Sequence, residues 1–151
     1  MSVGLRLLKA IGESSFWRRT GRLHTWLYRS TGGRIGHRAG QLANLLLTTT
    51  GRRSGAERTV PLTYMADGER FVLVASNGGS DRHPAWWLNL REQPHATVQV
   101  GSRTLAVVAH QADAVERARL WPKLKAMNPF YAAYERITSR EIPVVVLEPV
   151  R

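Results

Sequence analysis

From Asn44 onward, short runs of apolar and β-branched residues alternate with turns that contain glycine. This alternation is typical of antiparallel strands joined by hairpins. Asp67-Gly68 and Gly101-Ser102 have the composition of tight turns between adjacent strands. The pattern predicts six strands, over Leu45–Thr50, Arg58–Met65, Arg70–Ser76, Ala96–Val100, Thr104–His110 and Ile142–Leu147.

Apolar residues at helical spacing interrupt these strands. Asp113 suits the start of a helix, Pro122 is expected to divide that helix, and Pro129 suits a first turn, where a missing N–H costs little. The predicted helices cover Pro84–Arg91, Ala112–Met127 and Pro129–Ile137. Six strands with short hairpins and a few helices predict a mainly β protein, a small antiparallel barrel with helical insertions.

The first 40 residues have a different pattern. Leu7, Leu8 and Ile11 share one helical face, and Phe16, Leu23 and Leu27 continue at helical spacing. Residues 32–40, GGRIGHRAG, contain four glycines and are expected to form a linker. We therefore divide the chain into a basic amphipathic helical arm with a linker, residues 1–40, and a barrel domain, residues 41–151.

Charge reinforces this division. The net charge is +11, and residues 1–40 hold eight basic side chains against one acidic side chain. Such a field favours polyanions: a nucleic acid, an acidic membrane surface or a multiply charged small molecule. The chain has no cysteine, which excludes disulfides, and no apolar run near the roughly 20 residues that span a bilayer. No signal peptide is recognisable, so we expect a cytoplasmic protein.

The sequence between the first two predicted strands is suited to anions. LLLTTTGRRSGAERTVPL, Leu45–Leu62, places Arg52, Arg53 and Ser54 between two glycines, with Arg58 at the start of the returning strand. Glycines allow exposed N–H groups to form an anion-binding concavity, and arginine forks match phosphate or carboxylate oxygens. The alternative is an ordinary solvated β-turn.

Three further motifs are weak when taken alone. A predicted strand ends in ASNGG, residues 75–79. The two glycines would let a flat ligand approach the backbone there, and the alternative is a flexible loop. PAWWLNL, residues 84–90, has adjacent tryptophans, of which one can enter the core while the other covers a cleft. In NPFYAAY, residues 128–134, Tyr131 and Tyr134 share a helix face. Their rings could bracket an aromatic ligand, and the alternative is a half-buried aromatic stripe. The five histidines lack the spacing of metal ligands, so no metal site is expected.

In their order, these motifs resemble the deazaflavin-dependent nitroreductase family over about residues 40–150. The resemblance implies a split antiparallel β-barrel of the FMN-binding type and the reduced deazaflavin coenzyme F-420 as cofactor. It further implies contacts with the cofactor from the hairpin, the following strand, the ASNGG segment and the tryptophan helix. The implied cofactor-binding residues are Arg52, Arg53, Ser54, Arg58, Pro61, Leu62, Thr63, Ala75, Ser76, Asn77, Trp86, Asn89 and Tyr131.

The sequence departs from the family at three positions. Asn77 stands where lysine is frequent, which removes a cation near the anionic part of the cofactor. Asn128 replaces a tyrosine of the nitroimidazole-activating members, and Thr63 stands where some members have tyrosine. The Asn77 departure weakens the match near the anionic part of the cofactor, and the Asn128 departure predicts a different substrate pocket.

The implied activity is hydride transfer from the reduced deazaflavin to a quinone or another lipophilic electron-poor acceptor, nitroaromatic compounds included. The cofactor supplies the hydride chemistry, so the protein needs to orient it and to donate a hydrogen bond. Tyr131, Tyr134 and Ser76 are the candidate catalytic residues. Because an ordinary tyrosine has a pKa of about 10, hydrogen bonding is favoured over proton donation.

Several alternatives stay open. One is an FMN-binding or haem-degrading split-barrel protein, and another is a protein that binds the deazaflavin without turnover. A basic nucleic-acid-binding module is a third alternative. No nucleic-acid partner is expected, because the basic residues form neither a recognition helix nor an aromatic sheet pattern. The N-terminal arm suits peripheral contact with the anionic inner face of the cell membrane. The alternative is that the arm packs on the barrel or forms contacts in a dimer. Monomer and homodimer both remain open.

Overall fold

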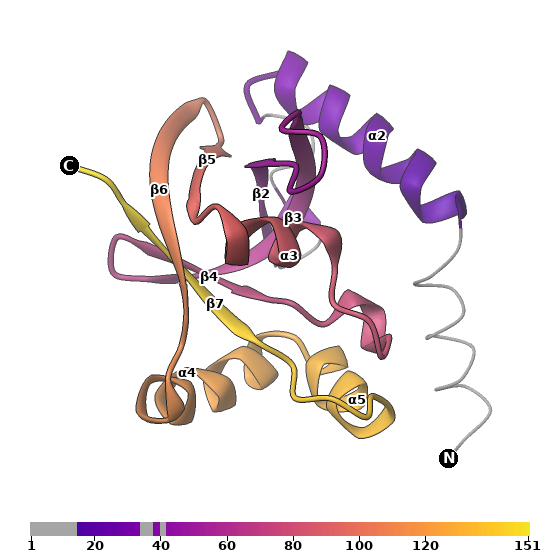
Figure 1. The fold of residues 1–151 in the computed structure, drawn as a ribbon, viewed down its shortest axis with the longest axis vertical. Helices are drawn as coiled ribbons and strands as arrows, with labels where there is room; N and C mark the ends of the chain where they lie inside the picture. The colour runs from indigo at the N-terminus through magenta and orange to yellow at the C-terminus, as the bar shows by residue number, and fades with distance from the viewer. Residues whose placement is uncertain (1–14, 34–37, 40–41) are drawn as a thin grey trace.

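The computed structural model describes residues 15–33, 38–39 and 42–151. A sheet of seven antiparallel strands forms the centre of the molecule (Figure 1). The predicted helical face over residues 3–11 lies outside the described residues, as does part of the predicted linker. The strands are β1 (Arg38–Ala39), β2 (Leu42–Thr50), β3 (Glu57–Asp67), β4 (Arg70–Val74), β5 (His95–Val100), β6 (Arg103–Gln111) and β7 (Val144–Pro149).

Strand β2 closes the sheet into a barrel. It pairs with β3 along its length, from Ala43 opposite Tyr64 to Thr50 opposite Glu57. Its other edge pairs with β5, where Leu47 lies opposite Val98. The remaining order is β3-β4-β7-β6-β5, so six strands form the barrel and β1 extends one edge of β2. The predicted antiparallel barrel is therefore confirmed.

Alternation along the strands separates two cores. One face of each strand points into the barrel, where Leu45, Leu47, Leu73 and Val98 are buried. Helix α3 (Ala85–Glu92) adds Trp86, Trp87 and Leu90 to this inner core. Both tryptophans are thus largely buried, as expected for at least one of them.

The opposite face of β4 and β7 carries a second core. Val72, Val144 and Val146 point outward and pack under α4 (Ala114–Met127) and α5 (Phe130–Ile137). Figure 1 shows these two helices together on one side of the barrel, away from α2 (Ser15–Ser30). Helix α5 therefore rests on the outside of the barrel wall and carries its tyrosines there.

Two local predictions need correction. Helix α4 is continuous through Pro122, because the missing N–H of this proline leaves only the carbonyl of Ala118 unbonded, and that residue is exposed to water. The turn between β3 and β4 consists of Gly68 and Glu69, since Asp67 still pairs with Arg70. The Gly101-Ser102 turn and the Asp113 cap, which accepts a hydrogen bond from the Glu116 N–H, are as predicted.

The C-terminal end of α2 is fixed to the barrel by Tyr28, which is fully buried. Its hydroxyl accepts a hydrogen bond from the Gly101 N–H at 2.7 Å and donates one to the Asn44 carbonyl at 3.2 Å. Gly33 lies so close to the turn that a Cβ there would come within 2.4 Å of Gly101 Cα. This end of α2 is therefore part of the packed body.

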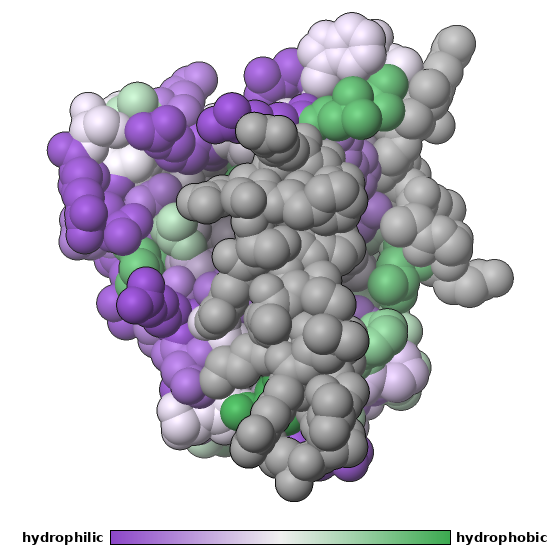
Figure 2. Space-filling view, turned by 90° about the vertical axis from the view of Figure 1, so that its right-hand side faces the viewer, coloured by the Kyte–Doolittle hydropathy of each residue, from purple (hydrophilic) through white to green (hydrophobic). Residues whose placement is uncertain are grey.

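None of the helices in the described ranges has the length and apolar character needed to cross a membrane. On the face shown in Figure 2, hydrophobic residues form small separate areas among hydrophilic ones.

We predict that Tyr28→Phe lowers the free energy of unfolding by about 1–3 kcal/mol, because the partly buried Gly101 N–H loses its acceptor. Urea denaturation followed by tryptophan fluorescence measures the change. Tyr64→Phe is the matched control, since the ring of Tyr64 packs edge-on against Phe71. Equal stability of the two variants would contradict the anchoring role of Tyr28.

Candidate functional site

A cavity of about 270 Å³ lies between β3 and α5, and Leu73 and Trp86 of the inner core form part of its wall. Strand β3 contributes three successive residues. The end of β4 and the loop after it, helix α3, Asn128 and helix α5 supply the others. The lining residues are Pro61, Leu62, Thr63, Leu73, Val74, Ser76, Gly78, Trp86, Asn128, Tyr131 and Tyr134. Pockets of this size approach the roughly 300 Å³ at which small-molecule sites begin.

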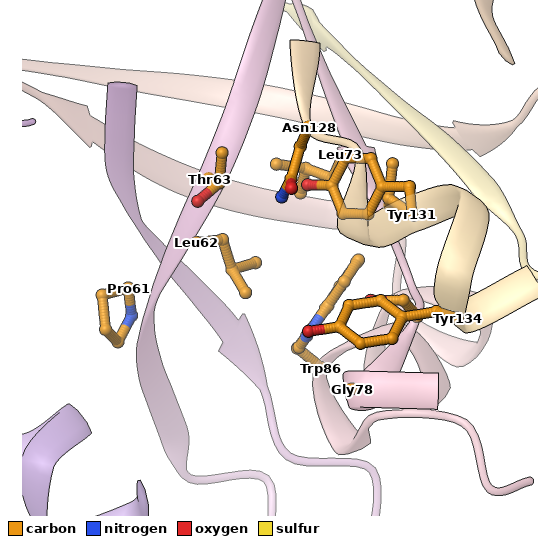
Figure 3. Close-up of a pocket in the computed structure, with 11 residues that line it drawn as sticks. Pro61, Leu62, Thr63, Leu73, Gly78, Trp86, Asn128, Tyr131 and Tyr134 are labelled. Carbon is orange, nitrogen blue, oxygen red and sulfur yellow. The ribbon is translucent and has the colours of Figure 1, made fainter. Parts of the chain in front are cut away.

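The cavity has two facing walls (Figure 3). Pro61, Leu62 and Thr63 follow β3 on one side. Tyr131 and Tyr134 project from α5 on the other side, with their hydroxyl groups directed toward the β3 side. The space between an apolar strand and two phenols is suited to a flat ring with polar edges.

Burial sets the protonation of both tyrosines. Desolvation raises the pKa of Tyr131, and a hydrogen bond with the Asn128 side chain opposes this rise only in part. Desolvation also raises the pKa of Tyr134. Since an ordinary tyrosine has a pKa of about 10, both phenols are neutral near pH 7 and act as hydrogen-bond donors.

The tip of the β2–β3 hairpin is a tight loop tied to α3. The Asn89 side chain accepts hydrogen bonds from the Arg52 backbone N–H at 3.2 Å and from Arg52 Nη1 at 3.0 Å. Its amide nitrogen donates to Thr49 Oγ1 at 3.1 Å. Asn89 is only 3% exposed, so it fixes the hairpin from behind and does not line the cavity.

Helix α3 and strand β3 connect this loop to the cavity. On α3, Trp86 lines the cavity one turn before Asn89, about 4.5 Å along the helix axis. On β3, Arg58 lies three residues before Pro61, about 10 Å along the strand. The arginine loop is therefore separated from the cavity by one turn of α3 and by three residues of β3.

The arginines of the hairpin are free of carboxylate partners within the described part of the chain. Arg53 and Arg58 are exposed and make no ion pair there. The ion pairs lie elsewhere, beginning with Arg70 and Asp67 at the far end of β3. Ser54 is also exposed, and its hydroxyl accepts a hydrogen bond from the Ala56 N–H at 3.2 Å. Positive charge at the hairpin tip is thus available for an external anion.

Only some of the ASNGG residues, in the loop after β4, face the cavity. Ser76 and Gly78 line the cavity. Ala75 is fully buried, and the Asn77 side chain turns away to donate a hydrogen bond to the Arg82 carbonyl at 3.1 Å. The structure thus brings part of the predicted site together in the cavity lining. The predicted residues that do not line the cavity are Arg52, Arg53, Ser54, Arg58, Ala75, Asn77 and Asn89.

Three cavity residues and one residue behind the loop were not predicted. The three are Leu73, Val74 and Gly78, of which Gly78 had a sequence signal in its place in ASNGG. Asn128 also lines the cavity, and the sequence analysis had named it as a change in the expected substrate pocket. Arg140 lies behind the ASNGG loop and had no sequence signal, because its partners are backbone carbonyls distant in the sequence.

This fold defines the class of split-barrel proteins. A putative pyridoxamine 5'-phosphate oxidase from Listeria innocua shares the fold, with a TM-score of 0.50 and 15% identity over 74% of this chain and 86% of that chain. Such a likeness concerns the fold alone.

Residues 20–149 match the family described as F420H(2)-dependent quinone reductase, and the chain belongs to that family. The F420H(2)-dependent quinone reductase Rv1261c of Mycobacterium tuberculosis (strain ATCC 25618 / H37Rv) is 45% identical over 130 residues, which cover 83% of this chain and 87% of that protein.

Two solved structures are similar at the level of sequence as well as fold. One is described as an F420-H2 dependent reductase, FDR-A, with a TM-score of 0.64 and 37% identity over 70% of this chain and 93% of that chain. The other is described as a domain-swapped dimer, with a TM-score of 0.68 and 32% identity over 89% of this chain and 98% of that chain.

We predict that Asn89→Ala loosens the arginine loop, because Arg52 and Thr49 lose their shared partner. The free energy of unfolding should fall by about 1–3 kcal/mol, and trypsin should cleave after Arg52 or Arg53 faster than in the unchanged protein. Gln93→Ala, an exposed amide directly after the same helix, is the control. A cleavage rate equal to that of the control would refute the tether.

Proposed function

We propose that this protein is an oxidoreductase that transfers a hydride from reduced coenzyme F-420 to a quinone. The observation that carries this proposal is the cavity between β3 and the α5 tyrosines, next to a loop of arginines without carboxylate partners in the described chain. Membership of the quinone reductase family supports the same chemistry. The 45% identity to the mycobacterial quinone reductase extends over most of both chains.

The residues present fit a deazaflavin. Pro61, Leu62 and Trp86 offer an apolar surface for a flat ring system, and Thr63 and Ser76 offer polar groups for its edge. The cavity accommodates a ring, but it is too small for a phosphate-bearing side chain and an oligoglutamate tail. These anionic parts would lie along β3 toward Arg58 and Arg53, where the free guanidinium groups match phosphate oxygens.

When bound, the reduced deazaflavin supplies the hydride. The residues of the protein bind and orient the two reactants. The β3 wall and Trp86 restrict the position of a ring, and Tyr131 and Tyr134, neutral because burial raises the pKa of each, donate hydrogen bonds to an acceptor oxygen. A quinone carbonyl gains negative charge as it is reduced, so a hydrogen bond aimed at that oxygen strengthens during the reaction. Water supplies the proton.

Nitroaromatic compounds are a second acceptor class that the same donors suit, since a nitro oxygen also accepts hydrogen bonds. Asn128 lies at the cavity wall together with Tyr131, and it lowers the pKa of Tyr131 in opposition to burial. We propose that this pair selects planar acceptors with a carbonyl oxygen.

We predict that Arg53→Ala and Tyr131→Phe have separable effects. Arg53→Ala should weaken coenzyme F-420 binding about tenfold, as expected for one charge-assisted contact with phosphate, and should leave kcat nearly unchanged. Tyr131→Phe should lower kcat about 10- to 100-fold with little change in binding, because its hydrogen bond acts on the acceptor. Tryptophan fluorescence measures binding, and loss of reduced coenzyme with a water-soluble naphthoquinone measures turnover.

Arg103→Ala is the matched control, an exposed arginine at the β5–β6 turn. If both test variants bind and turn over like this control, the site is wrong. A titration with FMN separates the cofactor classes, and tighter binding of FMN than of coenzyme F-420 would overturn the deazaflavin proposal.

We also propose that α2 makes peripheral contact with an anionic membrane, where lipophilic quinones reside. Leu23 is 58% exposed and Trp26 is 64% exposed, and the exposed Arg22 and Arg29 occupy the same helix face. Apolar side chains flanked by arginines are typical of helices that lie on anionic lipid.

Vesicle sedimentation tests this contact. Binding to vesicles with anionic lipid should exceed binding to neutral vesicles, and Trp26→Ala should reduce it several-fold, because less apolar surface enters the lipid. Val115→Ala is the control, since Val115 is 82% exposed on α4. Binding that survives Trp26→Ala unchanged would exclude α2 as the contact.

A further inference from the structure

The short turn η1 (Asn77–Gly79) beside the cavity has an unusual backbone. Its three residues all have positive φ, at 48°, 64° and 82°. Glycine adopts this region freely, but Asn77 does so only with local support. Gly78 lines the cavity, so the shape of this turn determines part of the cavity wall.

Arg140 supplies that support from behind the loop. Its guanidinium group donates hydrogen bonds to backbone oxygens on both sides of the turn and faces a histidine ring. The acceptors are the carbonyls of Ala75 at 3.0 Å, Ser76 at 3.0 Å, Ser80 at 3.1 Å and Arg82 at 3.2 Å, and His83 Nδ1 at 3.3 Å.

The partners of this guanidinium are neutral. Burial lowers the pKa of Arg140, but arginine starts near 12.5, so the group remains charged. Burial and the charges of Arg140 and Arg91 lower the pKa of His83, which keeps its ring neutral and able to accept. All of these hydrogen bonds are therefore charge-assisted, which makes each of them stronger than a neutral one.

The segment that carries Arg140 also joins the loop to α5. Thr138 Oγ1 donates to the Ser80 carbonyl at 3.2 Å, and the Ser139 N–H donates to Asp81 Oδ1 at 3.0 Å. Gly79 packs directly on α5, because a Cβ there would lie 2.6 Å from Ile137 Cδ1 and 3.2 Å from Tyr134 Cδ1. One connected unit therefore contains the loop of Ser76 and Gly78 and the helix of Tyr134.

We propose that Arg140 is a positioning residue for hydride transfer. It holds Ser76 and Gly78 at a fixed separation from Tyr134, so that two stacked substrates meet at reacting distance. This inference rests on the proposed function. The planar fork of arginine reaches several carbonyls at once, whereas lysine offers donors from a single nitrogen. An error of about 1 Å in such a separation costs on the order of 100-fold in rate.

The test compares Arg140→Ala and Arg140→Lys with Arg136→Ala, an exposed arginine on α5 that makes no ion pair in the described residues. Turnover is measured as oxidation of reduced coenzyme F-420 by a water-soluble naphthoquinone, and coenzyme affinity by tryptophan fluorescence. Arg140→Ala should lower kcat roughly 10- to 100-fold, while Kd changes less than about threefold, because the arginine hairpin is untouched. Guanidinium ion at millimolar concentration should restore part of kcat in this variant and not in Arg136→Ala.

Arg140→Lys keeps the charge and guards against failure of the alanine variant to fold. It should lose about fivefold or more in kcat, since one nitrogen cannot replace the fork. Full activity of Arg140→Lys, or a folded Arg140→Ala with the kcat of the unchanged protein, would overturn the proposal. An unchanged protein that does not oxidise the coenzyme with any quinone would instead refute the proposed function.

Discussion

The pairing of β2 with both β3 and β5 is the constraint on which the rest of the structure depends. It closes six strands into a barrel whose interior is filled by side chains such as Leu45, Leu47 and Val98. A filled barrel leaves no room inside for a cofactor. The candidate site lies at the edge of this filled interior, on β3 beside the closing strand, where Leu73 and Trp86 of the inner core reach the cavity.

An outer wall alone is too open to hold two reactants, so other segments must enclose them. Helix α5 supplies the facing wall because the outward residues of β4 and β7 form a second apolar core that holds it. Helix α3 contributes in two ways, since Trp86 lines the cavity while Asn89 ties down the arginine loop. The cavity is therefore assembled from segments distant in the sequence, and Arg140 is one of the residues that join these segments, through its hydrogen bond to the Ser76 carbonyl.

The sequence predicted the parts of the molecule that depend on local patterns. Alternation and turn residues located the six barrel strands, and the order of the motifs indicated the family. Prediction was weaker where a partner is distant in the sequence. Asn89 was predicted to contact the cofactor, and in the structure its side chain forms hydrogen bonds with Arg52 and Thr49. Arg140 had no sequence signal, because its hydrogen-bond acceptors are backbone carbonyls. Pro122 was predicted to divide its helix, but the helix continues through it, because water can bond the carbonyl that the proline leaves without a partner.

The central claim is that a deazaflavin ring lies between β3 and α5 with its phosphate at the arginine hairpin. A crystal structure of the complex with oxidised coenzyme F-420 tests it most directly. The account predicts the ring between Leu62 and Tyr134, beside Trp86, with the phosphate within hydrogen-bonding distance of Arg53 or Arg58. A ring bound elsewhere, or a phosphate remote from the hairpin, would contradict it.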